Sequence, residues 1–159
     1  MSESNEALEE IRRNVKGKIL LVGRKIGQEK FDDLGAGLRI EAKPLKYLTV
    51  GNLVAWSTGL FSKFAGGEFE SIVLHRFLYK RVKEYIEDPV TVLAEVERIL
   101  PTGGVLIVNS FLLDDVTKDF RSADSFFTEE EMKGMLENQG FRRISRIATR
   151  DTRIFICEK

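Results

Sequence analysis

His75, the only histidine in the chain, directly follows an apolar run that predicts a buried strand. Its imidazole can take a proton from a hydroxyl or amine group of a substrate; a hydrogen-bonded structural role is the alternative. The sequence contains no G-x-S-x-G turn around a nucleophilic serine and no phosphate-binding loop with a lysine before serine or threonine.

A pair of glycines, Gly23 and Gly27, forms a second candidate site directly after an apolar run. Glycines at this spacing either let a ligand approach the backbone closely or simply allow a tight turn from a strand into a helix. The pattern alone leaves both interpretations open.

The composition excludes several classes of function. Lys and Arg together number 25, as do Asp and Glu, so no net charge draws the protein to nucleic acid or to an anionic membrane. Cys157 is the only cysteine and has no internal partner for a disulfide, which favours a reducing, cytoplasmic location. With one histidine and one cysteine, a zinc site is not expected. The polar, acidic stretch Met1–Glu10 is not a secretory signal, and no apolar run approaches the ~20 residues of a membrane span.

The elements that must position these residues alternate between strand and helix patterns. Lys18–Val22, Phe69–Leu74 and Val105–Asn109 are apolar on both faces, as buried parallel strands must be, so we expect them to be central neighbours in one sheet. Residues 1–159 are therefore expected to form a single α/β domain, a Rossmann-like three-layer sandwich with a mostly parallel sheet and a reversed C-terminal β-hairpin. The other expected strands are Leu38–Ala42, Tyr47–Val50, Arg142–Ala148 and Thr152–Glu158. Ser4 can cap a first helix, which carries Leu8, Ile11 and Val15 at helical spacing and ends at Lys16-Gly17. Further helical patterns occupy Ile26–Leu34, Pro89–Leu100 and Glu129–Asn138.

Three motifs in the second half resemble a known family. Phe69-Glu70 opens a strand, Glu95–Gly104 contains a helix end followed by P-T-G-G, and Phe127–Phe141 follows the pattern F-T-x-E-E-h-x-x-h-L-x-x-x-G-F, where h is apolar. In this order and spacing the stretch Phe69–Ile144, about half of the chain, resembles the class I S-adenosylmethionine-dependent methyltransferases of the small-molecule type. The resemblance implies a seven-stranded sheet with a reversed last hairpin and S-adenosylmethionine as the cofactor. It also implies that His75 lies near the opening of the substrate pocket, which makes it the catalytic candidate.

The first half departs from that family at the cofactor loop. The family has an acidic residue near the end of strand one and then G-x-G-x-G, whereas here Leu21 stands at the acidic position and Lys25 replaces the middle glycine. The resemblance implies that Gly23, Lys25 and Gly27 lie against the cofactor. The Lys25 side chain either binds the carboxylate of the cofactor or fills the pocket, and its long stem favours the second role. Because a side chain at the middle position fills space that the ligand needs, we expect S-adenosylmethionine to bind weakly or not at all.

Two further positions complete the implied cofactor site. Glu41, eighteen residues after Gly23, falls where the family binds the ribose hydroxyls, and Asn52 follows Gly51 where the family meets the adenine amino group. Only ten residues separate Glu41 from Asn52, which is too few for the usual intervening helix. Two functions therefore remain open: a methyltransferase with an unidentified acceptor, or an inactive methyltransferase fold that serves as a binding or scaffolding subunit.

Two surface features suggest partners. The apolar segment Leu53–Phe64, which contains Trp56, either closes over a pocket or forms an interface, and we expect a homodimer or a partner complex through it. Five arginines near the last hairpin either contact phosphates or belong to a solvated sheet edge, and the zero net charge favours the second interpretation. They are Arg142, Arg143, Arg146, Arg150 and Arg153.

Overall fold

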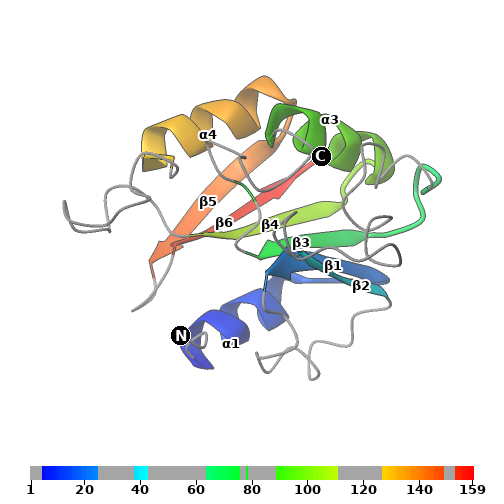
Figure 1. Ribbon diagram of the computed structural model, residues 1–159, viewed down its shortest axis with the longest axis horizontal. Coiled ribbons are helices and arrows are strands. Elements are labelled where there is room, and N and C mark those ends of the chain that lie inside the picture. The colour runs from blue at the N-terminus through cyan, green and yellow to red at the C-terminus, as the bar shows by residue number, and fades with distance from the viewer. Residues whose placement is uncertain are drawn as a thin grey trace.

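The computed structural model describes residues 5–24, 38–42, 64–75, 78, 89–110, 127–148 and 153–159. Within these ranges it contains one six-stranded sheet and three helices, labelled as in Figure 1. The strands are β1 (Ile19–Arg24), β2 (Leu38–Ala42), β3 (Ser71–His75), β4 (Val105–Ser110), β5 (Arg142–Ala148) and β6 (Arg153–Glu158), and the helices are α1 (Asn5–Asn14), α3 (Pro89–Ile99) and α4 (Glu129–Asn138).

The sheet has the strand order β2-β1-β3-β4-β6-β5. The pairings from β2 to β4 are parallel, whereas β6 is antiparallel to both β4 and β5. Five strands therefore run one way and β6 runs the other way, which makes the sheet mixed. The prediction that β1, β3 and β4 are central neighbours is confirmed, and so is the reversed C-terminal hairpin.

The helices cover both faces of the sheet, as Figure 1 shows: α1 lies against one face, and α3 and α4 lie against the other. Successive residues of a strand point to opposite faces, so each central strand contributes to two cores. Leu21 and Val73 belong to the core that includes Ile11 of α1, whereas Leu20 and Ile72 belong to the core shared with α3 and α4. This arrangement is the predicted Rossmann-like three-layer α/β sandwich.

Both ends of α4 carry local signals that define its length. Thr128 is the N-cap: its side-chain oxygen accepts a hydrogen bond from the Glu131 backbone N–H, and the Glu131 carboxylate accepts one from the Thr128 N–H, each at 3.1 Å. Gly140 has a φ of 93°, a left-handed conformation that glycine adopts without steric cost. The predicted bounds Glu129–Asn138 are confirmed at both ends.

Some boundaries differ from the prediction. The third strand begins at Ser71 and ends at His75, so His75 is the last residue of the strand and not the first residue after it. The reason is that the backbone of His75 still pairs with β1 on one side and β4 on the other. The predicted helix Ile26–Leu34 and the predicted strand Tyr47–Val50 lie outside the described residues.

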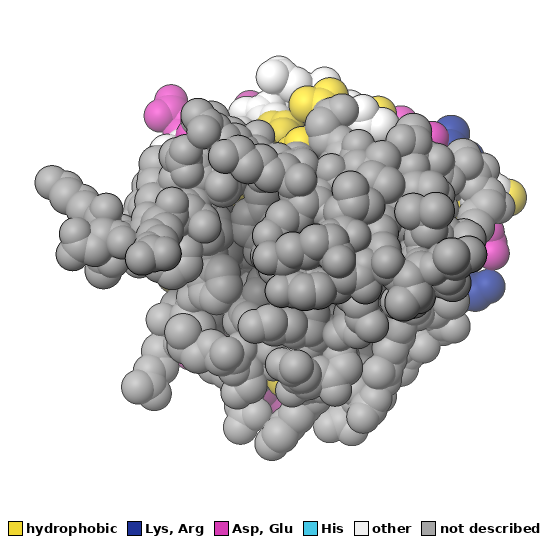
Figure 2. All heavy atoms as spheres, in the orientation of Figure 1, with side chains coloured by type: hydrophobic (Ala, Val, Ile, Leu, Met, Phe, Trp, Pro, Cys, Tyr) yellow, Lys and Arg dark blue, Asp and Glu magenta, His cyan; other side chains and the backbone are white. Residues whose placement is uncertain are grey.

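The described surface carries charges of both signs. In the space-filling view, acidic, basic and apolar side chains are interspersed along the rim of the face shown (Figure 2), in keeping with the net charge of zero. Among the helices that the structure describes, none has the length and apolar character of a membrane span.

Candidate functional site

Four residues form a row across the carboxyl ends of four adjacent strands. Gly23 of β1 is in register with Glu41 of β2 and with His75 of β3, and His75 is in register with Asn109 of β4. In open α/β sheets, ligands bind in the crevice outside the carboxyl ends of the strands. The backbone thus brings together three of the residues that the sequence analysis selected, Gly23, Glu41 and His75, and adds Asn109.

The other predicted cofactor residues lie outside the part of the chain that the structure describes: these are Lys25, Gly27 and Asn52. Their proposed contacts with a cofactor therefore remain predictions.

Gly23 is held in close contact with the neighbouring strand. A β-carbon built on Gly23 would lie 2.2 Å from the backbone oxygen of His75 and 2.8 Å from its β-carbon. No real β-carbon tolerates such a contact with backbone, so this position needs glycine whether or not a ligand is present. The site therefore depends on a packing requirement that the sequence pattern did not reveal.

His75 and Asn109 form a buried polar pair at the same edge. Both residues are fully buried, and the amide nitrogen of Asn109 lies 3.0 Å from Nδ1 of His75. The pair lies on the α1 side of the sheet, because Val73 and Ile107, two positions earlier in each strand, belong to the core on that side. Asn109 is not among the site residues predicted from the sequence. The only local signal for it is that a polar residue ends the apolar run of β4.

Ser71 is buried on the same face of β3 but at the opposite end of the strand. Its hydroxyl donates to the backbone oxygen of Lys16 at 2.7 Å and accepts from the Lys16 N–H at 2.8 Å. Ser71 therefore fastens the segment after α1 to the sheet and does not belong to the candidate site.

Leu21 stands where the methyltransferase pattern has an acidic residue. Its side chain is fully buried in the core that includes Ile11 of α1. A carboxylate there would lose its hydration without a compensating partner from these apolar neighbours. In this chain the position is part of the hydrophobic core.

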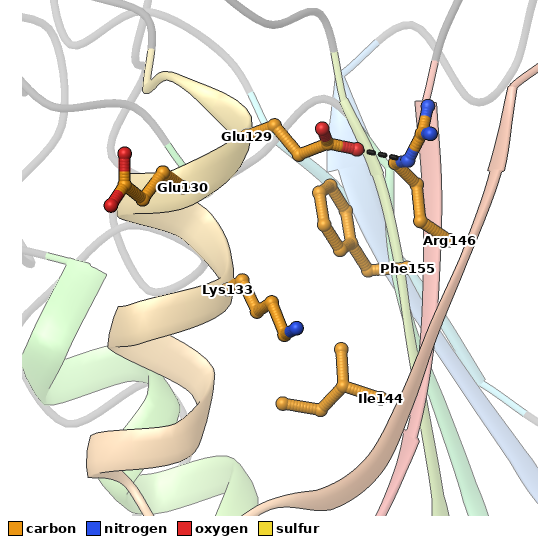
Figure 3. A pocket seen from close by; sticks show the side chains of 6 residues that line it. All are labelled: Glu129, Glu130, Lys133, Ile144, Arg146 and Phe155. Carbon is orange, nitrogen blue, oxygen red and sulfur yellow. Dashed lines mark ion pairs between the residues drawn. The ribbon is translucent and has the colours of Figure 1, made fainter.

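A separate cavity of about 440 Å³ lies between α4 and the C-terminal hairpin (Figure 3). An ion pair between Glu129 and Arg146 lies at one side of the cavity, and the Lys133 side chain extends into the space between the helix and the hairpin. The cavity is lined by two acidic, two basic and two apolar side chains: Glu129, Glu130, Lys133, Arg146, Ile144 and Phe155. Because these charges balance, the cavity does not favour a ligand of either sign.

The hairpin arginines have acidic partners at two positions. Arg146 pairs with Glu129, and Arg143 lies 3.3 Å from a carboxylate oxygen of Glu158. Arg143 also has a φ of 53° and lies between Arg142 and Ser145, where the pairing of β5 with β6 shifts register. Within the described residues, this edge strand therefore combines charges with a β-bulge, two features that discourage pairing with another sheet.

Comparison at the level of sequence gives no assignment. No family model matches the chain, and no curated protein matches it.

Comparison at the level of structure is informative. A methyltransferase from Thermotoga maritima that depends on S-adenosylmethionine matches with a TM-score of 0.58 at 16% identity, over 97% of this chain and 94% of that protein. One from Methanosarcina mazei matches with a TM-score of 0.56 at 18% identity, over 100% and 99% of the two chains. The chain has the class I methyltransferase fold. At these identities the likeness concerns the fold alone.

Two other proteins with the methyltransferase fold were solved with a ligand. The 1,6-didemethyltoxoflavin N1-methyltransferase of Burkholderia thailandensis, with bound 1,6-didemethyltoxoflavin and S-adenosylhomocysteine, has a TM-score of 0.60 at 13% identity over 98% of this chain and 77% of that one. PigF with S-adenosylhomocysteine has a TM-score of 0.61 at 17% identity. The match covers 94% of this chain and 53% of PigF, so the chain spans about half the length of this longer neighbour.

Proposed function

We propose that the chain is an S-adenosylmethionine-dependent methyltransferase that holds its cofactor at the carboxyl ends of β1 and β2, with Lys25 lowering the affinity. The observation that supports this proposal is the register pairing of Gly23 with Glu41. The two residues were selected from separate motifs for contact with one cofactor, and they lie in register on adjacent strands. Neighbours of the same fold that were solved with S-adenosylhomocysteine add support.

The chemistry of methyl transfer makes few demands on particular side chains. A lone pair of the acceptor attacks the methyl carbon, the bond from that carbon to the sulfonium sulfur breaks, and S-adenosylhomocysteine leaves as a neutral thioether. The protein mainly contributes orientation and a site from which water is excluded. A base is needed only where the acceptor carries a proton. The acceptor is left open among small molecules, RNA and proteins.

A catalytically inactive scaffolding subunit is the second candidate, and two observations favour it. Leu21 is a core residue where the family has an acid, and the absence of a side chain at Gly23 is explained by the backbone of His75 without any ligand. If this alternative holds, neither S-adenosylmethionine nor S-adenosylhomocysteine binds.

Calorimetric titration with S-adenosylmethionine and S-adenosylhomocysteine distinguishes the two candidates. We expect the unmodified protein to bind more weakly than the micromolar range, and Lys25→Gly to tighten binding at least tenfold, about 1.4 kcal/mol, because the backbone becomes accessible. Lys25→Arg is the matched control: it keeps a long basic side chain and should gain nothing. In the Lys25→Gly background, Glu41→Ala should weaken binding again if Glu41 meets the ribose.

The outcomes lead to different conclusions. If Lys25→Gly remains folded by circular dichroism and binds neither ligand, the cofactor proposal fails and the scaffolding alternative stands. Clear micromolar binding by the unmodified protein would support the cofactor but contradict the role given to Lys25.

A further inference from the structure

The contact between His75 and Asn109 restricts where the imidazole can carry its proton. The amide nitrogen of Asn109 lies 3.0 Å from Nδ1 of His75. A carboxamide nitrogen has two N–H donors and no lone pair to offer, so Nδ1 must be the acceptor of this hydrogen bond. A neutral imidazole has one N–H group, and with Nδ1 accepting, that proton is on Nε2.

The surroundings hold the pair in this arrangement. Both residues are fully buried, and in a buried site an imidazolium would lose hydration and would also point an Nδ1–H at the N–H of Asn109. The backbones of the two residues are paired with each other, and Gly23 packs against His75 from the other side. Three adjacent strands therefore fix the ends of β3 and β4 around this contact.

We infer that Asn109 is a positioning residue that fixes His75 as the neutral Nε2–H tautomer, so that His75 offers a hydrogen-bond donor and not a proton acceptor at the carboxyl edge of the sheet. The lone pair of Nδ1 is engaged by Asn109, and Nε2 carries the proton. In this state the imidazole has no lone pair with which to take a proton from a substrate. Of the two roles considered for His75, the geometry favours the hydrogen-bonded one.

The tautomer depends on the amide nitrogen of Asn109, and not its oxygen, facing Nδ1. It is independent of whether the chain binds S-adenosylmethionine. Any contact between Nε2–H and a ligand group, by contrast, rests on the proposed function. A result that contradicts the tautomer therefore leaves the cofactor proposal standing, and the absence of cofactor binding leaves the tautomer standing.

Nitrogen NMR of the unmodified protein tests the inference directly. His75 is the only histidine, so protein labelled uniformly with 15N gives one imidazole Nδ1 signal and one Nε2 signal without any assignment problem. We expect an unprotonated Nδ1 and a protonated Nε2 at neutral pH, together with a scalar coupling across the hydrogen bond from Nδ2 of Asn109 to Nδ1. A protonated Nδ1, an imidazolium, or the absence of that coupling would overturn the inference.

Substitutions then assign the cause to Asn109. In Asn109→Asp the carboxylate can only accept a hydrogen bond, so we expect Nδ1 to gain a proton. Asn109→Leu removes the hydrogen-bond donor at similar side-chain volume, and the strong preference for a proton on Nε2 should be lost. Ser71→Ala is the matched control, because it deletes a buried polar group on the same face of β3 and should leave the tautomer unchanged. If the Nε2–H tautomer persists in both Asn109 variants, or if Ser71→Ala disturbs it equally, Asn109 does not have this role.

Discussion

Gly23 of β1 and His75 of β3 are paired across the sheet, and the backbone of His75 leaves no room for a side chain at position 23. From the sequence, both residues are candidates for chemistry: Gly23 as part of a ligand-binding turn and His75 as a proton acceptor. Their contact depends on the register between β1 and β3, which joins residues 52 positions apart. Residue types and local spacing do not show which residues face each other across neighbouring strands. The contact between Asn109 and His75 could not be predicted from the sequence for the same reason.

The first prediction concerns Gly23. We expect Gly23→Ala to lower the free energy of unfolding by about 1–3 kcal/mol, because the new methyl group would meet the backbone of His75, which cannot move without disturbing the strand. Gly134→Ala is the matched control: among the residues that the structure describes, a β-carbon there meets nothing within 4 Å. Because the residue lies inside α4, about 0.5–1 kcal/mol of added stability is expected. Urea unfolding measures both changes. Unchanged stability in Gly23→Ala would show that the two strands separate more easily than the structure indicates.

The second prediction concerns Cys157. Burial raises the pKa of the Cys157 thiol to about 12, and its Sγ lies 3.6 Å from the backbone oxygen of Leu106, to which it donates. Because the thiolate is the reactive form, iodoacetamide at pH 8 should modify the native protein at least about 100-fold more slowly than the urea-unfolded protein. Mass spectrometry gives both rates, and equal rates would contradict the burial.

The raised pKa of Cys157 also gives a pH dependence of stability. The ordinary thiol pKa of 9.0 applies to the unfolded chain, and the folded value is about 12. The unfolded state therefore loses its proton first, so the contribution of this thiol is complete below about pH 9 and is lost as the pH rises toward 12. Unfolding experiments at several pH values on the unmodified protein and on Cys157→Ala should differ in this window, with a shallower decline in the variant.

At the scale of elements, the second half of the chain follows its local signals closely. Pro89 begins α3, and the capping box and Gly140 delimit α4. These signals act between residues a few positions apart, which is why the sequence predicts them. The bulge at Arg143 was not predicted, because a register shift is a property of two strands together.

The third prediction concerns the capping box of α4. We expect Thr128→Ala to cost about 1 kcal/mol of stability, since the Glu131 backbone N–H loses its acceptor. Thr128→Ser keeps the hydroxyl and should cost much less. Glu131→Ala removes the reciprocal bond, and the double variant should cost less than the sum of the two single variants because both bonds belong to one motif. Additive costs in urea unfolding would show that the two bonds are independent.

At the scale of the whole molecule, the sequence predicts the fold better than the site. The three buried apolar runs specify the centre of the sheet, and the motifs after Phe69 indicate the methyltransferase fold that the structural neighbours share. The candidate site depends on the first half, where the cofactor loop departs from the family pattern and where Lys25, Gly27 and Asn52 lie outside the described residues. The contribution of these three residues to cofactor affinity is measured by titration with S-adenosylmethionine.

The structure narrows the segment proposed for association. Phe64 is buried, and its ring packs edge-on against Phe69 at 5.3 Å between centroids. The backbone oxygen of Phe64 also accepts a hydrogen bond from Arg98 of α3 at 3.0 Å. Phe64 therefore belongs to the core of its own chain. The rest of the segment Leu53–Phe64 lies outside the described residues, and the proposed interface is reduced to Leu53, Val54, Trp56, Leu60 and Phe61.

The last prediction is that the protein forms a homodimer or a partner complex through these five side chains. Burying each large apolar side chain against another chain would contribute on the order of 2 kcal/mol, and tryptophan is the residue type that most often anchors an interface. Sedimentation at micromolar concentration should show association by the unmodified protein and its loss in Trp56→Ser. Val90→Ser is the matched control, because Val90 of α3 is an apolar side chain that is 51% exposed, and its replacement should leave association unchanged. If the protein sediments as a monomer and Trp56→Ser alters neither its solubility nor the retention of any partner, the segment is internal packing, and the scaffolding alternative loses the partner surface proposed for it.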